Sequence, residues 1–387
     1  MNVAIIIDNL NGGGAERVAQ YLGNHLLKQG VNVYYFLLNK SRTDVYEVSG
    51  EIVDTGLGRK LAGFGSDKYK DSYIIFQCGQ KLKKYKKQYG IDISISFMEM
   101  CNFLNVASKC NDRVILTIHT TLSARSDYHG TLYDHKNIRK VCERADTVVA
   151  VSEYIKADLV KDYCVKESKL VVIPNTVYGV DKNVDSGSRI SGNSILCVGR
   201  LVGVKQHDRI LRAFSYVRKR NKEVKLYVLG TGSNLDYLKY IAQKLGIDDS
   251  VFFMGFCNNM GNYYSGARAL VMASMAEGFP NVMVEAMTYG APVITTDSPG
   301  GCGEIVGKTM NSSGIQYCDY GILTPYIKGK APRSSELEPE EILLGEAMLN
   351  IIDNDGLYKR YHEASLKRAE YYSEEKVMKM WEQLIGI

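Results

Sequence analysis

One stretch of the chain reads Glu277-Gly-Phe-Pro-Asn-Val-Met-Val-Glu285 and carries a carboxylate at each end. The apolar run 269–273 precedes it and the β-branched run 293–296 follows it, a pattern that predicts a strand, a loop, a helix and a second strand. Asn281 is a favourable N-cap residue, and Gly290 is a favourable residue just past the helix. The stretch therefore predicts one βαβ unit of a parallel sheet.

The start of this predicted helix is suited to binding an anion. The N–H groups of a first helical turn have no partners within the helix and attract negative charge. Glu277 would stand beside such an anion and Glu285 one turn deeper, which suits a ligand that carries both phosphate and hydroxyl groups. A sugar nucleotide is such a ligand. The alternative, a capped helix with two solvated glutamates, is the weaker hypothesis because of the turn and cap residues around this pair.

Length and composition predict a soluble protein of two domains. A chain of 387 residues exceeds one compact core, and an apolar share of 45% is ordinary for a globular protein. No run of 18 or more apolar residues occurs, and the first residues lack the basic region of a signal peptide, so we expect a cytoplasmic protein. The nine cysteines contain no C-x-x-C, which favours reduced thiols over a disulfide framework or a zinc site.

The net charge of +5 is concentrated in the first half of the chain. Residues 1–180 hold 24 Lys and Arg against 19 Asp and Glu, while the remainder holds 24 of each. Such a surplus suits an anionic membrane surface or a phosphorylated acceptor, although many enzymes carry as much without using it. No nucleic-acid-binding motif and no strongly basic domain occur, so nucleic acid is not an expected partner.

Short apolar strands alternate with helical stretches in both halves of the chain. The first strand, at 3–7, leads into the glycine-rich loop 9–16 and an amphipathic helix over 17–28. Residues 176–193 lose all periodicity, which predicts a linker. Further strands are predicted at 31–38, 93–97, 114–118 and 147–151 before the linker, and at 194–198, 225–229 and 251–254 after it.

This alternation predicts an α/β fold with two Rossmann-like, doubly wound parallel-sheet domains facing a cleft. We expect an acceptor-binding domain at residues 1–180 and a nucleotide-sugar-binding domain at 190–370. Apolar residues recur at helical spacing in the last segment, 371–387, and we expect this helix to pack back on the N-terminal domain.

Five segments, taken in order along the chain, resemble the family-4 retaining glycosyltransferases of the two-Rossmann (GT-B) architecture. Gly12-Gly-Gly-Ala-Glu-Arg-Val18 is similar to the family's amino-terminal loop, Gly199-Arg200-Leu with Lys205 to its diphosphate clamp, and the stretch that begins at Glu277 to its signature. The two remaining matches are Ile173-Pro-Asn175 and Gly321-Ile-Leu-Thr-Pro325. The segment 297–304 resembles the version found in bacterial enzymes that build polysaccharides or lipid-linked oligosaccharides.

The resemblance implies roles for individual residues. Arg200 and Lys205 would contact the diphosphate of the donor, and Glu285 would contact its ribose hydroxyls. Glu277 would contact the transferred sugar and His119 would lie under the sugar ring, so these two are the candidate catalytic residues. Further donor contacts are implied at Gly13, Gly14, Gly278, Phe279, Asn281 and Val282.

One position departs from the family pattern. Many members follow the histidine with an acidic residue or an asparagine, whereas Thr120 and Thr121 stand here. The second partner of the sugar at this point therefore stays open.

The residues also favour chemistry without a metal ion or a cofactor. Cleaving the anomeric C–O bond of a sugar nucleotide leaves a charged diphosphate, and stabilising that charge is the main demand. Arg200 and Lys205, together with the helix start near Asn281, would meet it. The D-x-D at Asp353-Asn-Asp355 falls in the predicted C-terminal helical region rather than at a strand end, and we interpret it as a solvated turn.

Retention of the anomeric configuration is likewise implied by the resemblance. A double displacement needs a carboxylate nucleophile, but Glu277 by the same analogy contacts sugar hydroxyls. Front-face transfer, in which the leaving phosphate takes the acceptor proton, is therefore the favoured mechanism.

A basic helix is predicted around Lys81-Leu-Lys-Lys-Tyr-Lys-Lys87. Its apolar positions repeat at helical spacing beside five lysines, and they are Ile75, Cys78, Leu82, Tyr85 and Tyr89. A solvated outer helix of the first sheet is the favoured interpretation. The alternative is attraction to an anionic membrane or to a pyrophosphate-linked lipid acceptor.

Together these features predict a retaining, metal-independent glycosyltransferase that moves a hexose or N-acetylhexosamine from a nucleotide diphosphate sugar, with UDP as the expected nucleotide. The expected acceptor is a glycan or a polyprenyl-linked glycan in surface polysaccharide synthesis, and peripheral contact of the N-terminal domain with the inner face of the membrane would fit it. Two alternatives stay open: a sugar-nucleotide 2-epimerase of the same architecture, and a catalytically silent sugar-nucleotide-binding subunit.

Overall fold

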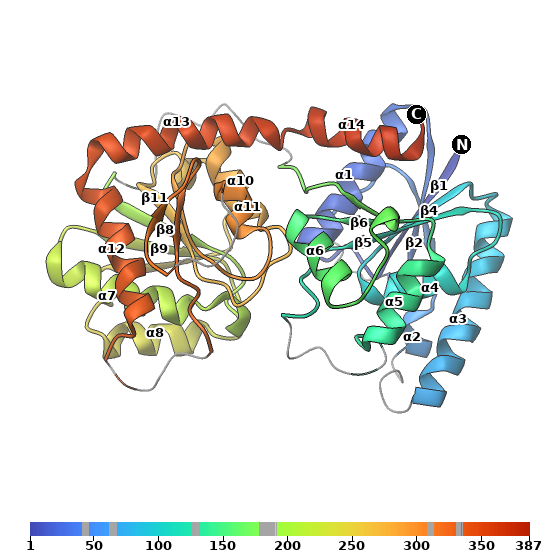
Figure 1. Ribbon diagram of the computed structural model, residues 1–387, viewed down its shortest axis with the longest axis horizontal. Helices are drawn as coiled ribbons and strands as arrows, with labels where there is room; N and C mark the ends of the chain where they lie inside the picture. The colour runs from blue at the N-terminus through green and yellow to red at the C-terminus, as the bar shows by residue number, and fades with distance from the viewer. Residues whose placement is uncertain are drawn as a thin grey trace. The chain divides into compact units, whose positions relative to one another are not determined.

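The computed structural model describes residues 1–40, 46–61, 68–124, 130, 132–177, 190, 192–307, 313–329, 334 and 336–387. The chain divides into two compact units (Figure 1). Unit 1 comprises Met1–Thr176 and Glu374–Ile387, and unit 2 comprises Val177–Ser373. Most of the predicted linker at 176–193 lies outside the described residues.

Unit 1 is built on a parallel sheet of seven strands in the order β3-β2-β1-β4-β5-β6-β7. The order reverses direction between β1 and β4, which is the switch point where doubly wound sheets bind ligands. The strands are β1 (Asn2–Ile7), β2 (Asn32–Leu37), β3 (Glu51–Asp54), β4 (Ile93–Phe97), β5 (Arg113–Ile118), β6 (Thr147–Ala150) and β7 (Leu170–Val172).

The central strands of unit 1 are buried along nearly their whole length. Every residue of β4 is buried, as are five of the six residues of β1 and of β5. Strands covered on both faces are expected to be continuous apolar runs, and this property made them visible in the sequence. The helices of the unit are α1 (Gly14–Lys28), α2 (Gly58–Leu61), α3 (Lys68–Gln88), α4 (Glu99–Ala107), α5 (His135–Arg144), α6 (Glu153–Lys161) and α14 (Glu374–Ile385).

Helix α14 belongs to unit 1 although it ends the chain. Its Glu382 carboxylate pairs with His25 Nε2 of α1 at 2.8 Å, and its Leu384 carbonyl accepts from Arg113 Nη1 at 2.7 Å. Trp381 is 3% exposed and anchors the apolar face of the helix. The last turns of the chain therefore complete the core of the N-terminal unit.

Unit 2 repeats the architecture with a second sheet of seven strands, in the order β10-β9-β8-β11-β12-β14-β13. All neighbours pair in parallel except β13, which runs antiparallel to β14 at one edge. The strands are β8 (Ser194–Val198), β9 (Lys225–Leu229), β10 (Val251–Gly255), β11 (Ala269–Met272), β12 (Val293–Thr296), β13 (Gln316–Tyr317) and β14 (Ile322–Thr324).

A buried ionic network ties two of the helices of unit 2 together. Glu341 Oε1 accepts from Arg209 Nη1 at 2.8 Å and from Arg212 Nε at 2.7 Å, with all three residues buried. Because each charge has a partner, the network fixes how α7 packs on α12. The helices of the unit are α7 (His207–Arg220), α8 (Leu235–Lys244), α9 (Gly261–Tyr264), α10 (Asn281–Thr288), α11 (Cys302–Val306), α12 (Pro339–Asp353) and α13 (Asp355–Tyr371).

The two sheets confirm the predicted fold class of two doubly wound, Rossmann-like α/β domains. The strands predicted from apolar runs are present within one or two residues of their expected bounds. Four short strands were not predicted: β3, β7, β13 and β14. They lie at or next to the edges of the sheets, where half-exposed strands of two to four residues leave little apolar pattern.

Candidate active site

The residues predicted to bind the donor divide between the two units. Eight of them, from Arg200 to Glu285, belong to unit 2, and Gly13, Gly14 and His119 belong to unit 1. In each unit they come after strands whose carboxyl ends meet at one edge of a parallel sheet. This edge is where doubly wound sheets bind their ligands.

Backbone contacts hold the strand ends of unit 2 against one another. The Gly199 N–H donates to the Leu229 carbonyl at 3.0 Å, and the Met275 N–H donates to the Val204 carbonyl at 2.8 Å. A Cβ atom added at Gly230 would lie 2.0 Å from the Gly199 carbonyl oxygen, so only glycine permits this approach. The loops after β8, β9 and β11 therefore form one continuous surface.

Lys205 and Glu277 are direct partners on this surface. Lys205 Nζ lies 2.5 Å from Glu277 Oε1, and the Ser274 hydroxyl donates to the same oxygen at 2.5 Å. The side chain of Glu277 is 10% exposed and that of Lys205 is 23% exposed, so the pair meets solvent along one side. A cation suited to phosphate and a carboxylate suited to sugar hydroxyls are thus brought within one contact of each other.

The turn that carries Glu277 is clamped from the next strand. The Glu277 N–H donates to the Pro299 carbonyl at 2.9 Å, and the Gly278 carbonyl accepts from the Gly301 N–H at 3.0 Å. Gly300 has φ +126°, and a Cβ atom there would lie 1.8 Å from the Glu277 carbonyl oxygen. The loop after β12 therefore sets the position of Glu277.

Helix α10 begins one residue earlier than the cap chemistry predicted. Pro280 occupies the N-cap position with extended backbone, and Asn281 is the first helical residue, so Asn281 is not the N-cap. Proline and asparagine compete for the cap here, and the fixed φ of proline suits the extended conformation. The first turn of α10, with Asn281 and Val282 half-buried, still presents its N–H groups beside Glu277. Gly290 follows the helix with φ +74°, as predicted.

Glu285 lies one turn into α10 and is oriented by a residue that sequence reasoning missed. The Tyr264 hydroxyl donates to Glu285 Oε2 at 3.2 Å, and its ring stacks on Tyr289 with 5.9 Å between centroids. Tyr264 is 1% exposed. In the sequence it is one of 27 tyrosines, and nothing in its neighbours signals a contact 21 residues away.

Phe279 directs its side chain into the core of unit 2. It is buried, and its ring packs edge-on against Tyr372 with centroids 5.1 Å apart. A donor contact at Phe279 is therefore restricted to its backbone, as it is at Gly278. The ring itself anchors the turn to the C-terminal part of the unit.

Arg200 follows β8 and its side chain is exposed to solvent. The guanidinium carries five donors in a planar fork that matches phosphate geometry. Because Arg200 and Lys205 leave the same strand end, both cations lie on the ligand-binding edge of unit 2.

His207 adds a buried imidazole next to Lys205, which sequence reasoning included only as a helix residue. It is 4% exposed, and its Nδ1 atom has no hydrogen-bond partner among the described residues. Burial and the neighbouring Lys205 charge lower its pKa to about 4, so the ring is neutral at pH 7. No signal in the sequence distinguishes this histidine from an exposed one at the start of a helix.

In unit 1 the glycine-rich loop joins β1 to α1. Gly13 is the N-cap of α1 and Gly14 its first residue, so the helix starts three residues before the predicted Arg17. Gly12 is the glycine of the loop with a left-handed backbone, at φ +96°. Gly14 is exposed and Gly13 is half-buried, and their backbone lines the carboxyl edge of the sheet at the switch point.

His119 follows β5 on the same edge of unit 1 and is held in one orientation. Its ring stacks on Phe97 with 5.4 Å between centroids, and its Nε2 lies 2.9 Å from Thr117 Oγ1. The Thr117 hydroxyl donates to the Ser96 carbonyl at 2.8 Å, so its oxygen accepts from an Nε2–H and the histidine keeps Nδ1 as an acceptor. Burial lowers the pKa of His119 to about 4, so the ring is neutral at pH 7.

The D-x-D lies away from the candidate site. Asp353 ends α12, Asn354 caps α13, and Asp355 pairs with Arg268 at 2.6 Å, just before β11 begins. This places the motif at the amino edge of the sheet, opposite to Glu277. No cluster of three His, Cys, Asp or Glu with metal-binding geometry occurs in the described part of the chain.

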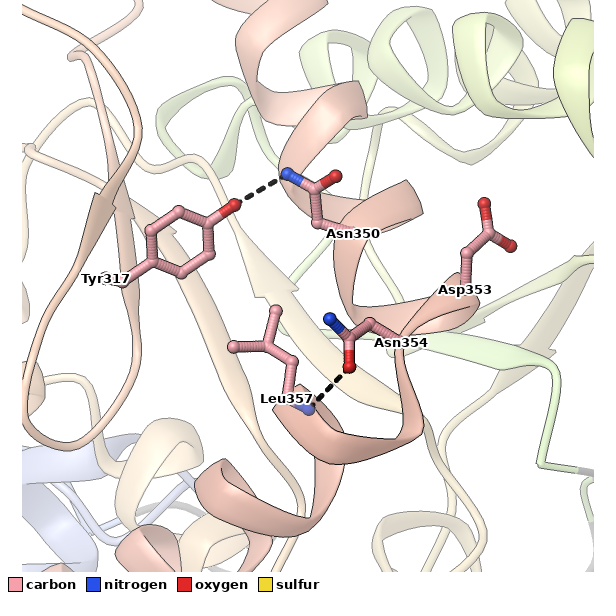
Figure 2. A pocket seen from close by; sticks show the side chains of 5 residues that line it. All are labelled: Tyr317, Asn350, Asp353, Asn354 and Leu357. Carbon is pink, nitrogen blue, oxygen red and sulfur yellow. Dashed lines mark hydrogen bonds between the residues drawn. The ribbon is translucent and has the colours of Figure 1, made fainter.

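A cavity of about 340 Å³ lies beside this motif (Figure 2). It is lined by Tyr317, Asn350, Asp353, Asn354 and Leu357, none of which is a predicted site residue. The Asn350 amide donates to the Tyr317 hydroxyl at 2.7 Å, so part of its polar lining is paired internally. The cavity is therefore distinct from the carboxyl edge that carries Glu277.

Within the residues that the structure describes, no helix is both long and apolar enough to cross a bilayer.

Two family models match the chain side by side. Residues 12–178 match the model described as Glycosyltransferase Family 4, and residues 182–315 match the model described as Glycosyl transferases group 1. The first match includes the glycine-rich loop and His119. The second includes Arg200, Lys205 and the stretch from Glu277 to Glu285.

Similar proteins are found among curated sequences and solved structures. An uncharacterized glycosyltransferase of Methanocaldococcus jannaschii is 28% identical over 62% of this chain and 63% of its own length. The N-acetylgalactosamine-N,N'-diacetylbacillosaminyl-diphospho-undecaprenol 4-alpha-N-acetylgalactosaminyltransferase of Campylobacter jejuni is 23% identical over 97% of this chain and 96% of its own. The crystal structure of Anabaena HepE in complex with UDP superposes with a TM-score of 0.75 at 16% identity, covering 100% of both chains.

The two adjacent matches, the paired seven-stranded sheets and the ordered motifs agree with one another. Members of this family are retaining, metal-independent hexosyltransferases that take the sugar from a nucleotide sugar. The chain belongs to glycosyltransferase family 4.

Proposed function

We propose that the protein transfers a hexose or N-acetylhexosamine from a UDP-sugar to a glycan or lipid-linked glycan in surface polysaccharide synthesis. The observation that carries the proposal is the contact of Lys205 and Ser274 with Glu277 at the start of α10. It sets a phosphate-binding cation, a carboxylate and a helix N-terminus side by side. A sugar diphosphate presents the complementary groups in the same order.

The assigned donor contacts follow from the chemistry of each group. Arg200 and Lys205 would bind the diphosphate, and the first turn of α10, from Gly278 to Val282, would add backbone N–H donors. Glu277 would accept from hydroxyls of the transferred sugar. Glu285, oriented by the Tyr264 hydroxyl, would accept from the ribose hydroxyls.

For unit 1 we assign the other half of the reaction. The bond between the anomeric carbon and the diphosphate oxygen breaks, the acceptor oxygen bonds to the same face of that carbon, and the acceptor proton passes to the departing phosphate. His119 is neutral and carries its proton on Nε2, so its Nδ1 would accept from a hydroxyl of the transferred sugar. Gly13 and Gly14 would allow the backbone to approach the donor.

The nucleotide and the acceptor are suggested by the similar proteins. Anabaena HepE binds UDP, and the Campylobacter enzyme is named for a diphospho-undecaprenol-linked acceptor and an N-acetylgalactosamine donor. The basic surplus of residues 1–180 supports an anionic, lipid-diphosphate-linked acceptor at the inner face of the membrane.

Calorimetry with UDP tests the diphosphate clamp. Arg200→Ala or Lys205→Ala should each weaken UDP binding by about ten-fold or more, since each removes a charge-assisted contact to phosphate. Lys222→Ala, an exposed lysine elsewhere on unit 2, should leave the affinity unchanged. Equal affinity in all four proteins would remove Arg200 and Lys205 from the site.

The donor and the reaction are tested separately from the clamp. A panel of nucleotide sugars should raise the melting temperature most for the true donor, because that donor binds the folded state most tightly. Incubation with this donor alone should leave its sugar configuration unchanged, whereas a 2-epimerase would alter it. Transfer that is unaffected by Glu277→Ala in a purified complex would indicate a silent subunit.

A further inference from the structure

Helix α3 presents two aromatic side chains to solvent. Tyr73 and Phe76 are each 61% exposed, and no other large apolar side chain in the described part of unit 1 is as exposed. The helix runs along the outside of the unit (Figure 1). Single exposed apolar residues are ordinary, but two rings one helical turn apart form a patch that needs an explanation.

The charges on α3 are distributed unequally around the helix. The inward face contains Cys78, Leu82 and Lys86, and Lys86 pairs with Asp112 at 2.8 Å with both side chains fully buried. One lysine of the predicted basic run therefore serves the core rather than the surface. On the opposite face, Lys84 and Lys87 are exposed and continue the row that Tyr73 and Phe76 begin.

The aromatic end of α3 extends past the ligand-binding edge of the sheet. Because α3 connects the parallel strands β3 and β4, it starts at their carboxyl edge and ends at their amino edge. Lys81 Nζ donates to the Thr55 carbonyl, just past β3, at 2.6 Å. Phe76 and Tyr73 precede Lys81 by five and eight residues, so they lie about 7 and 12 Å further along the helix.

We propose that this face of α3, made of Tyr73, Phe76, Lys84 and Lys87, docks unit 1 on an anionic lipid bilayer. Aromatic rings favour the interfacial region of a membrane, and lysines are attracted to anionic headgroups. The inference rests on the proposed function, because a lipid-linked acceptor would reach the carboxyl edge of unit 1 from the same surface.

The composition of the helix favours a bilayer over a protein as the occupant. The 21 residues of α3 contain seven lysines and one aspartate, so the partner must be strongly anionic. Two rings on a convex helix bury too little area for a stable protein interface, which needs on the order of 1,200 Å² in total. A bilayer has no such requirement, because it supplies both charge and an apolar interior.

Vesicle sedimentation with the full chain tests the inference. The protein should bind vesicles of phosphatidylcholine with phosphatidylglycerol and should not bind pure phosphatidylcholine vesicles. Lys84→Gln and Lys87→Gln should weaken binding roughly five-fold each, and raising the salt concentration should act in the same direction. The matched variants Lys222→Gln and Lys239→Gln, exposed lysines of unit 2, should bind as wild type.

A fluorescent reporter tests the aromatic part. The chain has one tryptophan, Trp381, which is buried on α14 and gives a constant background. Phe76→Trp should show a blue shift and quenching by brominated lipid when anionic vesicles are added. Tyr240→Trp, at a position 58% exposed on α8, should show neither. This substitution keeps an aromatic ring and so avoids a folding defect.

The outcomes separate this inference from the proposed function. Failure of the Phe76→Trp reporter to enter the bilayer, with UDP binding intact, would overturn the docking surface alone. Loss of UDP binding by wild type would overturn the proposed function instead. Concentration-dependent dimerisation that is abolished by Tyr73→Ala with Phe76→Ala would assign the patch to a second copy of the chain and would also overturn the inference.

Discussion

Lys205 and Glu277 are held against each other in a largely buried pair, with Ser274 as a third member. Such a pair contributes less through its attraction than is lost when one partner is removed, because the remaining charge stays desolvated. The residues that would bind the donor are therefore also positioned by each other. A donor diphosphate would enter a site whose cation is already fixed.

Lys205→Met should lower the free energy of unfolding by about 1–3 kcal/mol, because the Glu277 carboxylate then stays buried without its counter-charge. Adding Glu277→Gln should recover part of that loss. Chemical denaturation of the four proteins in a double-mutant cycle measures the coupling. Strictly additive effects would show that the two side chains do not interact in solution.

His207 makes the stability of unit 2 dependent on pH. Its folded pKa of about 4 lies below the ordinary value of 6.5, so the unfolded chain binds a proton first as the pH falls. The contribution is fully present above pH 6.5 and is lost as the pH falls toward 4.

Between pH 8 and pH 5, wild type should lose about 2 kcal/mol more unfolding free energy than His207→Gln. Urea denaturation at the two pH values, followed by circular dichroism, provides the comparison. An identical pH dependence in both proteins would mean that His207 is protonated in the folded state.

At the scale of elements, the loop after β12 positions the turn between β11 and α10. Gly300 approaches the Glu277 carbonyl so closely that a methyl group cannot fit, and its φ of +126° adds a second requirement for glycine. Two hydrogen bonds, from the Glu277 and Gly301 N–H groups, join the same segments. The geometry of Glu277 thus depends on a segment that has no donor contact of its own.

Gly300→Ala should displace the Glu277 turn and reduce sugar transfer by roughly 100-fold, since small displacements of positioning groups carry penalties of this size. Gly246→Ala is the matched control: Gly246 also has a left-handed backbone, with φ +65°, but no atom lies within 4 Å of an added Cβ. Transfer rates of the two variants, with melting curves to report folding, separate the clash from backbone strain. Equal activity would show that the turn tolerates the methyl group.

At the scale of the whole molecule, unit 1 is completed by the last helix of the chain. The apolar face of α14 includes Val377, Met378 and Trp381, all nearly fully buried. The His25–Glu382 and Arg113–Leu384 contacts add polar fixation. The N-terminal unit therefore cannot be completed before the chain is finished.

Truncation after Ser373 should destabilise unit 1, because it uncovers the apolar surface that α14 packs against. Hydrogen exchange should accelerate in α1 and β5, whose residues His25 and Arg113 contact α14, and should change little in β8 and β9 of unit 2. Uniform exchange rates in the full and truncated chains would contradict the assignment of α14 to the core of unit 1.

Much of the fold could be predicted from the sequence because buried parallel strands are continuous apolar runs. The strands β1, β4, β5, β8 and β11 were found in this way. The edge strands β3, β7 and β13 were missed because they are short and half-exposed, so partner strands define them more than their own residues do.

The candidate site divides in the same manner. The sequence by itself determined which residues follow the strand ends, because glycines, caps and charged side chains act through their nearest neighbours along the chain. Only the tertiary structure decided that Lys205 meets Glu277, 72 residues away, that Tyr264 orients Glu285, and that Lys86 turns inward to Asp112. These pairings depend on how the strands of each sheet are ordered, and local sequence patterns carry no information about which distant side chains that order brings together.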